Sequence, residues 1–183
     1  DLVTGGNLQK FHPLFEGIVR IIIFVAYMAL VSRMKDIHRV FMYHGAEHKT
    51  IFCYEHGLPL TVENVRKQSR FHPRCGTSFM FVMIILSILL SSALVLIFPG
   101  LQNVNRAVWI LVKLLVLPLV MGIGYEFIKY AGKHDNLLVK ILSAPGLWMQ
   151  RITTQEPTDD IIEVGIASLK AVITDNPEDD EIK

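Results

Sequence analysis

The feature that most constrains this chain is the segment Ser78–Phe98, which contains no charged residue and ends just before Pro99. About 20 apolar residues in an α-helix, each rising about 1.5 Å, are enough to cross the hydrocarbon core of a bilayer. In lipid, a helix satisfies all of its backbone hydrogen bonds internally, whereas an irregular segment cannot. The segment therefore predicts a membrane-spanning helix.

Leu14–Val31 predicts another span, provided that Glu16 and Arg20, one helical turn apart, lie at an interface or face the protein interior. The composition agrees, because 51% of the residues are hydrophobic, 19% are charged and the mean hydropathy is +0.41. The net charge is only +1 and we find no nucleic-acid motif, so no nucleic-acid partner is expected.

Ala107–Ile128 is nearly as apolar but contains Lys113, Pro118 and Glu126. Because proline removes a backbone donor, this segment predicts a span that is kinked or partly broken. The fold class that follows is all-α: a polytopic integral membrane protein with about three transmembrane helices, a helical loop and a C-terminal amphipathic helix.

The distribution of lysine and arginine predicts the topology of these spans. The connection from Ser32 to Thr77 is rich in both, whereas the connection from Pro99 to Arg106 has one basic residue. By the positive-inside rule the long loop faces the cytoplasm, and three crossings return the chain after the third span to the same side.

Two helices are expected after the spans. Leu137–Ile152 has the balance of apolar and basic residues that is typical of a helix at the membrane surface, and Ser143–Gly146 should interrupt it. Thr158 is a suitable N-cap for a final helix. Its apolar residues recur at helical spacing and need a partner to cover them: Ile162, Ile166, Leu169 and Ile173.

These segments predict a membrane domain over residues 1–152, which includes a motif-bearing loop over 33–77 and the interfacial helix 137–152. Residues 153–183 form a C-terminal cytoplasmic helix with an acidic tail, and the tail is predicted to be disordered. The expected partners are membrane lipids, with a homo-oligomer or a partner protein as a further expectation for the C-terminal helix.

The loop contains a possible metal-binding motif in the run Tyr43–Thr50. If this run is helical, His44 and His48 lie one turn apart on one face, so both imidazoles can bind one ion, and Glu47 lies beside them. The pattern H-x-x-E-H occurs in metallopeptidases in which the glutamate is the general base. The alternative interpretation is a polar interfacial helix whose histidines only form hydrogen bonds.

A second motif directly precedes the Ser78–Phe98 span. His72 and Cys75 stand around a proline turn and form a compact pair of donors, and Gly76 leaves room for a ligand. The chain has two cysteines, too few for a disulfide framework, so metal binding or a reduced compartment is favoured. Cys53 is interpreted as a small buried hydrophobic residue.

Three further residues complete the candidate site. Glu126 is a possible ligand, because it lies near the cytoplasmic end of the third span. Glu55 follows His48 on nearly the same face and could bind the ion or orient a ligand. Arg74 is first of all a topology determinant and headgroup contact, and the alternative is that it binds phosphate together with other loop arginines.

These runs are similar to those of the YqhQ-like family, bacterial membrane proteins described as predicted metal-dependent enzymes. The similarity covers about Phe41 to Leu169, and it includes five runs of the chain: Tyr43–Thr50, Glu63–Arg66, His72–Ser78, Gly124–Glu126 and Pro145–Pro157. The resemblance implies a metal site and a bacterial inner (cytoplasmic) membrane. It also implies a Gly-rich N-terminal segment that is largely missing here. The sequence has no initiator Met and no signal-peptide pattern at its start, so a processed or truncated product is expected.

The leading functional hypothesis is a membrane-embedded, zinc-dependent hydrolase that acts on a membrane-proximal peptide or lipid. His44 and His48 are ligands, completed from His72, Cys75 or Glu126, and Glu47 is the general base, as a metalloenzyme requires. If His72 and Cys75 both bind the ion, the site is closed and structural; if Glu126 or water takes one position, it is open.

Two other function classes remain open. A transporter or channel for a lipid, ion or metal would use the interrupted third span, where Pro118, Gly122 and Gly124 precede Glu126. A scaffold would use zinc only to fasten the loop and would dock a partner on its last helix.

Overall fold

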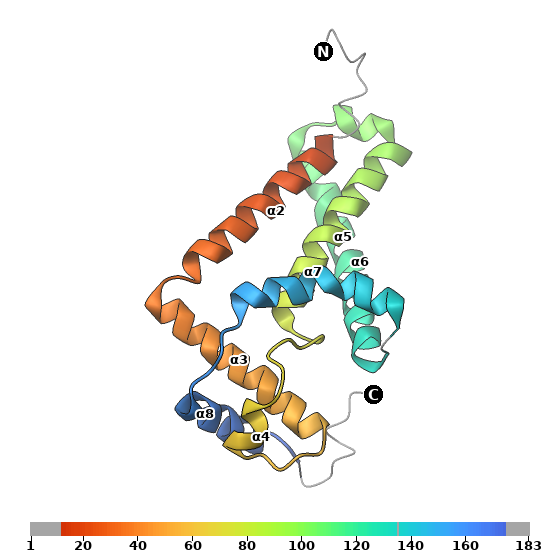
Figure 1. Ribbon diagram of the computed structural model, residues 1–183. Helices are drawn as coiled ribbons and strands as arrows, with labels where there is room; N and C mark the ends of the chain where they lie inside the picture. The colour runs from red at the N-terminus through yellow and green to blue at the C-terminus, as the bar shows by residue number, and fades with distance from the viewer. Residues whose placement is uncertain (1–11, 135, 175–183) are drawn as a thin grey trace. The chain divides into compact units, whose positions relative to one another are not determined.

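The computed structural model describes residues 12–134 and 136–174, and the regular structure of these residues is helical throughout (Figure 1). The all-α prediction is confirmed. The helices are α2 (His12–Val31), α3 (Lys35–Glu55), α4 (Val62–Arg66), α5 (Gly76–Ile97), the 3-10 helix η1 (Pro99–Asn103), α6 (Arg106–Lys133), α7 (Leu137–Thr153) and α8 (Asp159–Lys170). The predicted disordered tail and the first eleven residues lie outside the described part of the chain.

The chain divides into two compact units. The first, here called the apolar unit, comprises the chain up to Tyr27 and Pro73–Met149, and it contains most of α2 together with α5, α6 and most of α7. The second, the polar unit, comprises Met28–His72 and the chain from Gln150 onward, with α3, α4 and α8.

Three helices of the described chain are long and apolar enough to cross a membrane, over Leu14–Val31, Phe79–Ile97 and Arg106–Ala131. These ranges confirm the three predicted spans. Within them only 6%, 11% and 11% of the residues are buried, so most of the apolar side chains face outward. Leu115, for example, is 72% exposed. An apolar outer surface of this kind is what lipid-facing helices require.

The predicted break in the third span is wrong, because α6 continues as one helix through Pro118. Proline removes a single backbone donor, and the turns on both sides keep their own hydrogen bonds. The start of α6 is well capped, since the Asn105 side chain accepts a hydrogen bond of 2.9 Å from the Val108 amide.

The predicted interruption of α7 at Ser143–Gly146 is also wrong, because this helix runs through Pro145 without a break. Ser143, Gly146 and Met149 are buried at helical spacing. Packing of this face outweighs the low helix propensity of the Pro-Gly pair. In Figure 1, α7 runs at a steep angle to α5 and α6.

The polar unit has a small core of its own, in which α8 packs against α3 and α4. Helix α8 supplies half of this core, and the other half comes from α3 and α4. The six core residues are Ala46, Cys53, Val65, Ile161, Ile162 and Ile166. Full burial of an isoleucine side chain contributes about 1.5–3 kcal/mol. Two members of the predicted stripe, Ile162 and Ile166, are thus covered within the chain itself, whereas Leu169 and Ile173 are only half-buried.

The turns around α4 follow their sequence signals. Gly57, with a φ of 65°, lies just beyond α3, where only glycine adopts this left-handed conformation without strain. Thr61 caps α4 by accepting a hydrogen bond from the Asn64 amide at 3.3 Å. The helix ends at Arg66. Thr158 is the N-cap of α8 as predicted, but its side chain accepts no capping hydrogen bond.

Candidate metal centre

Helix α3 places His44 and His48 on one face, as predicted. The centroids of their imidazole rings are 4.4 Å apart, and the rings meet edge to face at 65°. Candidate ligand atoms of the two side chains lie within 4.8 Å of each other. His48 is 4% exposed and His44 is half-buried. Two imidazoles so placed can reach one ion.

In both histidines the Nδ1 atom forms a hydrogen bond with a backbone carbonyl. His44 Nδ1 lies 2.8 Å from the Thr153 oxygen, and His48 Nδ1 lies 2.6 Å from the Arg70 oxygen. A carbonyl oxygen can only accept, so each Nδ1 donates its proton. In a neutral imidazole the lone pair is then on Nε2, which is the arrangement that outer hydrogen bonds impose on metal-binding histidines.

His72 is fixed next to this pair by a reciprocal hydrogen bond with a buried amide. Its backbone N–H donates to Gln150 Oε1 at 2.8 Å, and Gln150 Nε2 donates to the His72 oxygen at 2.7 Å. The ring centroid of His72 is 5.6 Å from that of His48. Its Nε2 is 3.4 Å from Glu55 Oε2, so the two side chains are within hydrogen-bond distance.

The segment after α7 lies directly on α3 at Gly45. The Gln155 amide donates to the Phe41 oxygen at 2.8 Å, and a Cβ atom added at Gly45 would collide with the Gln155 oxygen. This close approach explains why glycine stands between Tyr43 and His48. It also brings the Thr153 carbonyl to His44.

A buried lysine fastens the loop after α4 to α3. The Lys49 ammonium donates to the Arg66 oxygen at 2.9 Å and forms an ion pair with Glu156. Arg70 adds a hydrogen bond of 2.5 Å from its guanidinium to the Thr154 oxygen. These contacts hold the segment from Arg66 to Arg70 at both of its ends. The backbone carbonyl of Arg70, which accepts the hydrogen bond from His48, belongs to this segment.

Glu47 lies outside the buried cluster, in an open groove of about 600 Å³ between α3 and α8. Its side chain is exposed, and His44 lines the same groove. The other lining residues are mostly apolar or small: Val40, Tyr43, Thr50, Ile51, Val164, Gly165, Ser168, Leu169 and Val172. A carboxylate and an imidazole thus share one solvent-accessible space.

The remaining predicted site residues belong to the apolar unit. Cys75 is buried at the N-cap of α5, with its sulfur 3.0 Å from Thr77 Oγ1. Arg74 is half-buried, and burial lowers the pKa of its guanidinium. Glu126 is exposed on α6.

Cys53 has the structural role that was predicted for it. It is fully buried in the core of the polar unit, and its sulfur donates to the Leu58 and Pro59 oxygens at 3.8 and 3.6 Å. Burial raises the pKa of the thiol, which keeps it protonated.

The sequence analysis missed the residues that hold the histidines in place. Gln150, Thr153 and Thr154 are at most 2% exposed although they are polar, and Lys49 is 4% exposed. A signal was present, because Gln150, Thr153 and Thr154 stand at helical spacing where the apolar segment that begins at Leu137 ends. Uncharged polar residues so placed indicate buried hydrogen bonds.

The fold and the histidine pair define a class: a helical protein with three candidate membrane spans and a polar helical unit in which His44 and His48 could bind one metal ion. Residues 2–175 match the family model described as a protein of unknown function (DUF1385), and the chain belongs to this family. No solved structure matches the chain.

One relative is the uncharacterized protein YqhQ of Bacillus subtilis (strain 168), which is 40% identical over 170 residues. The match covers 91% of this chain and 51% of the relative, so the chain spans about half the length of that protein. The family resemblance noted from the motifs is thereby confirmed, and neither description assigns an activity.

Proposed function

We propose that the protein is a membrane-embedded, zinc-dependent hydrolase of the bacterial inner membrane, which acts on a membrane-proximal peptide or lipid. The observation that carries this proposal is the pair of hydrogen bonds from Nδ1 of His44 and His48 to backbone carbonyls. They leave both Nε2 atoms as acceptors on one helix face.

The donor set fits zinc. Two imidazole nitrogens and the Cys75 thiolate are borderline to soft ligands, which suit zinc better than magnesium or calcium. Three protein ligands leave a fourth tetrahedral position open, and this is the pattern of catalytic rather than structural zinc. His72 is outside the group of residues that could hold the ion, and its Nε2 points to Glu55.

A zinc ion held there supplies one piece of chemistry, since it lowers the pKa of a bound water to about 7. Glu47 would accept the proton of the attacking water and return it to the leaving group. Its exposed carboxylate and the shared groove with His44 support this role. The apolar lining of the groove would hold the apolar part of a substrate. The basic residues of the 32–77 segment support a cytoplasmic location for this unit and for the C-terminus.

One observation favours a second candidate function, a structural zinc site. The rings of His48 and His72 are only 5.6 Å apart, so a modest rotation could add His72 as a fourth ligand. Four protein ligands would close the site and exclude water. The ion would then fasten the loop to α3, and Glu47 would have no catalytic role.

Metal analysis of the purified full chain in detergent tests the site. We expect one zinc ion per chain, lost in His44→Ala and in His48→Ala but retained in the control His38→Ala, because His38 is exposed on the same helix. A metal content that is negligible, or that neither substitution lowers, would overturn the proposal.

Glu47 separates the two candidate functions. We expect Glu47→Gln to retain zinc and to lower hydrolysis by about 100-fold or more, since general base catalysis typically contributes that much. The control is Glu63→Gln, an exposed carboxylate on α4. Turnover is measured by mass spectrometry of products released from phospholipid vesicles and from peptides that correspond to membrane-proximal segments. Hydrolysis that Glu47→Gln leaves unchanged, with zinc retained, would refute the catalytic role.

A further inference from the structure

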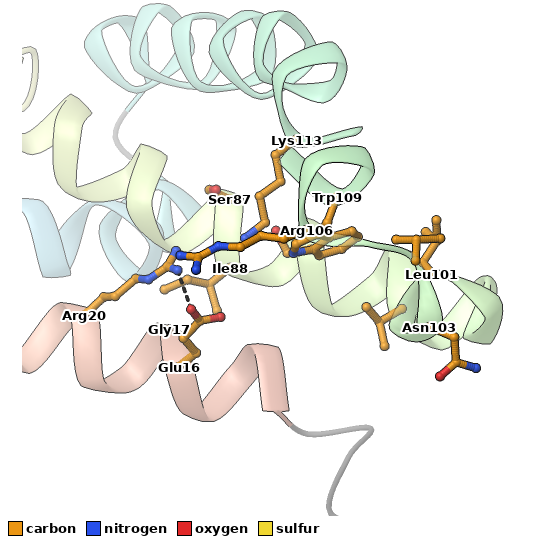
Figure 2. Close-up of a pocket in the computed structure, with 13 residues that line it drawn as sticks. Glu16, Gly17, Arg20, Ser87, Ile88, Leu101, Asn103, Arg106, Trp109 and Lys113 are labelled. Atoms are coloured by element: carbon orange, nitrogen blue, oxygen red, sulfur yellow. Dashed lines mark hydrogen bonds and ion pairs between the residues drawn. The ribbon is translucent and has the colours of Figure 1, made fainter. Parts of the chain in front are cut away.

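A second cavity, far less apolar than the surface around it, lies within the apolar unit. It has a volume of about 570 Å³ and is formed by α2, α5, α6 and the connection between α5 and α6 (Figure 2). None of the residues predicted for the metal site lines it. Besides apolar side chains, its described lining contains charged and polar residues: Glu16, Arg20, Ser87, Ser91, Asn103, Arg106, Trp109 and Lys113.

The described lining of this cavity is strongly positive. Arg20, Arg106 and Lys113 contribute three positive charges against the single carboxylate of Glu16, which leaves a net charge of +2. Glu16 pairs with Arg20 at 2.6 Å. In Figure 2 the side chains of Arg20 and Arg106 extend toward one another.

Lys113 lies farther along α6 than Arg106 and inside the span. Its ammonium is 5.1 Å from the centre of the Trp109 ring, in a cation–π contact. Arg106 is the first residue of α6, and Lys113 follows it by seven residues, which correspond to about 10 Å of α-helix. The positive charges therefore extend from the start of α6 into the apolar region. Ionisable groups at such depth are costly and usually mark a binding site or a pathway.

The close packing of α2 and α5 forms one wall of the cavity. Gly17 is buried, and a Cβ atom added there would lie 2.5–2.8 Å from side-chain atoms of Ile88, so only glycine allows this approach. Both residues line the cavity. α2 and α5 converge at this end of the unit and diverge along their length (Figure 1).

We infer that this cavity binds the phosphate-bearing headgroup of an anionic phospholipid. The Arg106 guanidinium can bind phosphate oxygens in a bidentate manner. Arg20, which also pairs with Glu16, and Lys113 add two further positive charges. Basic pockets between transmembrane helices bind such headgroups. Apolar residues of the lining, such as Ile88, Val95 and Leu101, continue the cavity with surface that suits an acyl chain. Free phosphate could use the cations but not this apolar part.

The cavity lies at the end of the spans where α5 ends and α6 begins, whereas α5 begins with the turn that carries Cys75. Because α5 crosses the membrane, the bound headgroup is in the leaflet opposite to the start of α5. The site is therefore separate from the proposed metal centre, and either assignment can fail without the other.

Lipid retention by the full chain tests this inference. The protein is reconstituted in nanodiscs with equal amounts of phosphatidylglycerol and phosphatidylcholine, released into a neutral detergent and examined by native mass spectrometry. We expect phosphatidylglycerol to be retained in preference to phosphatidylcholine. Arg106→Gln and Lys113→Gln should each weaken this retention about tenfold, because a hydrogen bond to a charged group is worth about 1.5–3 kcal/mol and 1.4 kcal/mol is a factor of ten.

The control is Lys133→Gln, an exposed cation in the last turn of α6. Arg106→Lys keeps the charge without the bidentate geometry and should lie between wild type and Arg106→Gln, and circular dichroism verifies that each variant is folded. Equal retention of both lipids would overturn the inference, and so would retention that both substitutions leave unchanged. If inorganic phosphate displaces phosphatidylglycerol at equal concentration, the cavity is a site for free phosphate and the lipid assignment is wrong.

Discussion

The two units of this chain are built from the same kind of helix but arrange polarity in opposite ways. In the apolar unit the large hydrophobic side chains face outward, as with Ile97 at 67% exposure, and charged side chains line an open cavity between the helices. In the polar unit Val65 and Ile162 are fully buried and charged side chains cover the surface. Apolar residues outside are what helices in lipid require, and apolar residues inside are what helices in water require.

Most of the buried polar side chains belong to the polar unit. They have defined partners, because no buried side-chain nitrogen or oxygen atom of the described residues lacks a hydrogen bond. Such a network specifies one arrangement, because leaving any member unpaired is costly. It is this network that fixes Nδ1 of both His44 and His48.

The largest effect is expected from Gln150→Leu. This change removes both hydrogen bonds between the Gln150 amide and the His72 backbone, and it leaves a buried N–H and a buried carbonyl without this partner. At about 1–3 kcal/mol for each group, the loss in stability is about 4 kcal/mol. Hydrogen exchange of α3 amides, measured by mass spectrometry on the full chain in detergent, reports the free energy of local opening.

Gln68→Leu is the matched control, since Gln68 is half-buried and its Nε2 donates to the Asn64 oxygen at the end of α4. It should cost no more than about 1 kcal/mol. If both substitutions changed exchange in α3 equally, the buried amide pair would not be what holds His72.

The next largest effect compares what surrounds the exposed apolar side chains of the two units. Leu115 in α6 and Val172 after α8 are both 72% exposed. Leu115→Arg should raise the apparent free energy of membrane insertion of α6 by about 3 kcal/mol, because arginine is costly near the centre of a span. Val172→Arg should change the stability of the polar unit by less than about 0.5 kcal/mol.

Insertion of α6 is measured by glycosylation mapping in microsomes, and stability of the polar unit by hydrogen exchange. A Leu115→Arg variant that inserts as efficiently as wild type would show that this face of α6 lies against protein or water rather than lipid.

The sequence predicted the elements of both units better than it predicted their contacts. The three spans follow from the length of the apolar segments. The shared face of His44 and His48 and the apolar stripe of α8 follow from local periodicity, which depends only on helix geometry. The continuity of α7 through Pro145 does not, because it results from packing of the buried face around Met149. Local propensity carries no information about such tertiary contacts.

The same limit explains what was missed at the candidate site. The pattern around His44 identified the donors, but the carbonyls of Arg70 and Thr153 that orient them come from segments distant in sequence. Backbone carbonyls are present at every position, so no residue type marks them. Gly45 was the nearest local signal, since a glycine inside a helix indicates that another segment approaches closely.

The smallest effect tests that close approach by comparing two glycines inside helices. At Gly45 an added Cβ would collide with the Gln155 oxygen, whereas at Gly122 in α6 it would meet nothing within 4 Å. Gly45→Ala gains up to about 1 kcal/mol of helix propensity but loses about 3 kcal/mol to overpacking, a net loss of about 2 kcal/mol. Gly122→Ala keeps the propensity gain alone. Thermal unfolding in detergent should therefore shift in opposite directions for the two variants. If both shifted upward, the segment after α7 would not lie against α3, and the hydrogen bond between Thr153 and His44 would lose its structural basis.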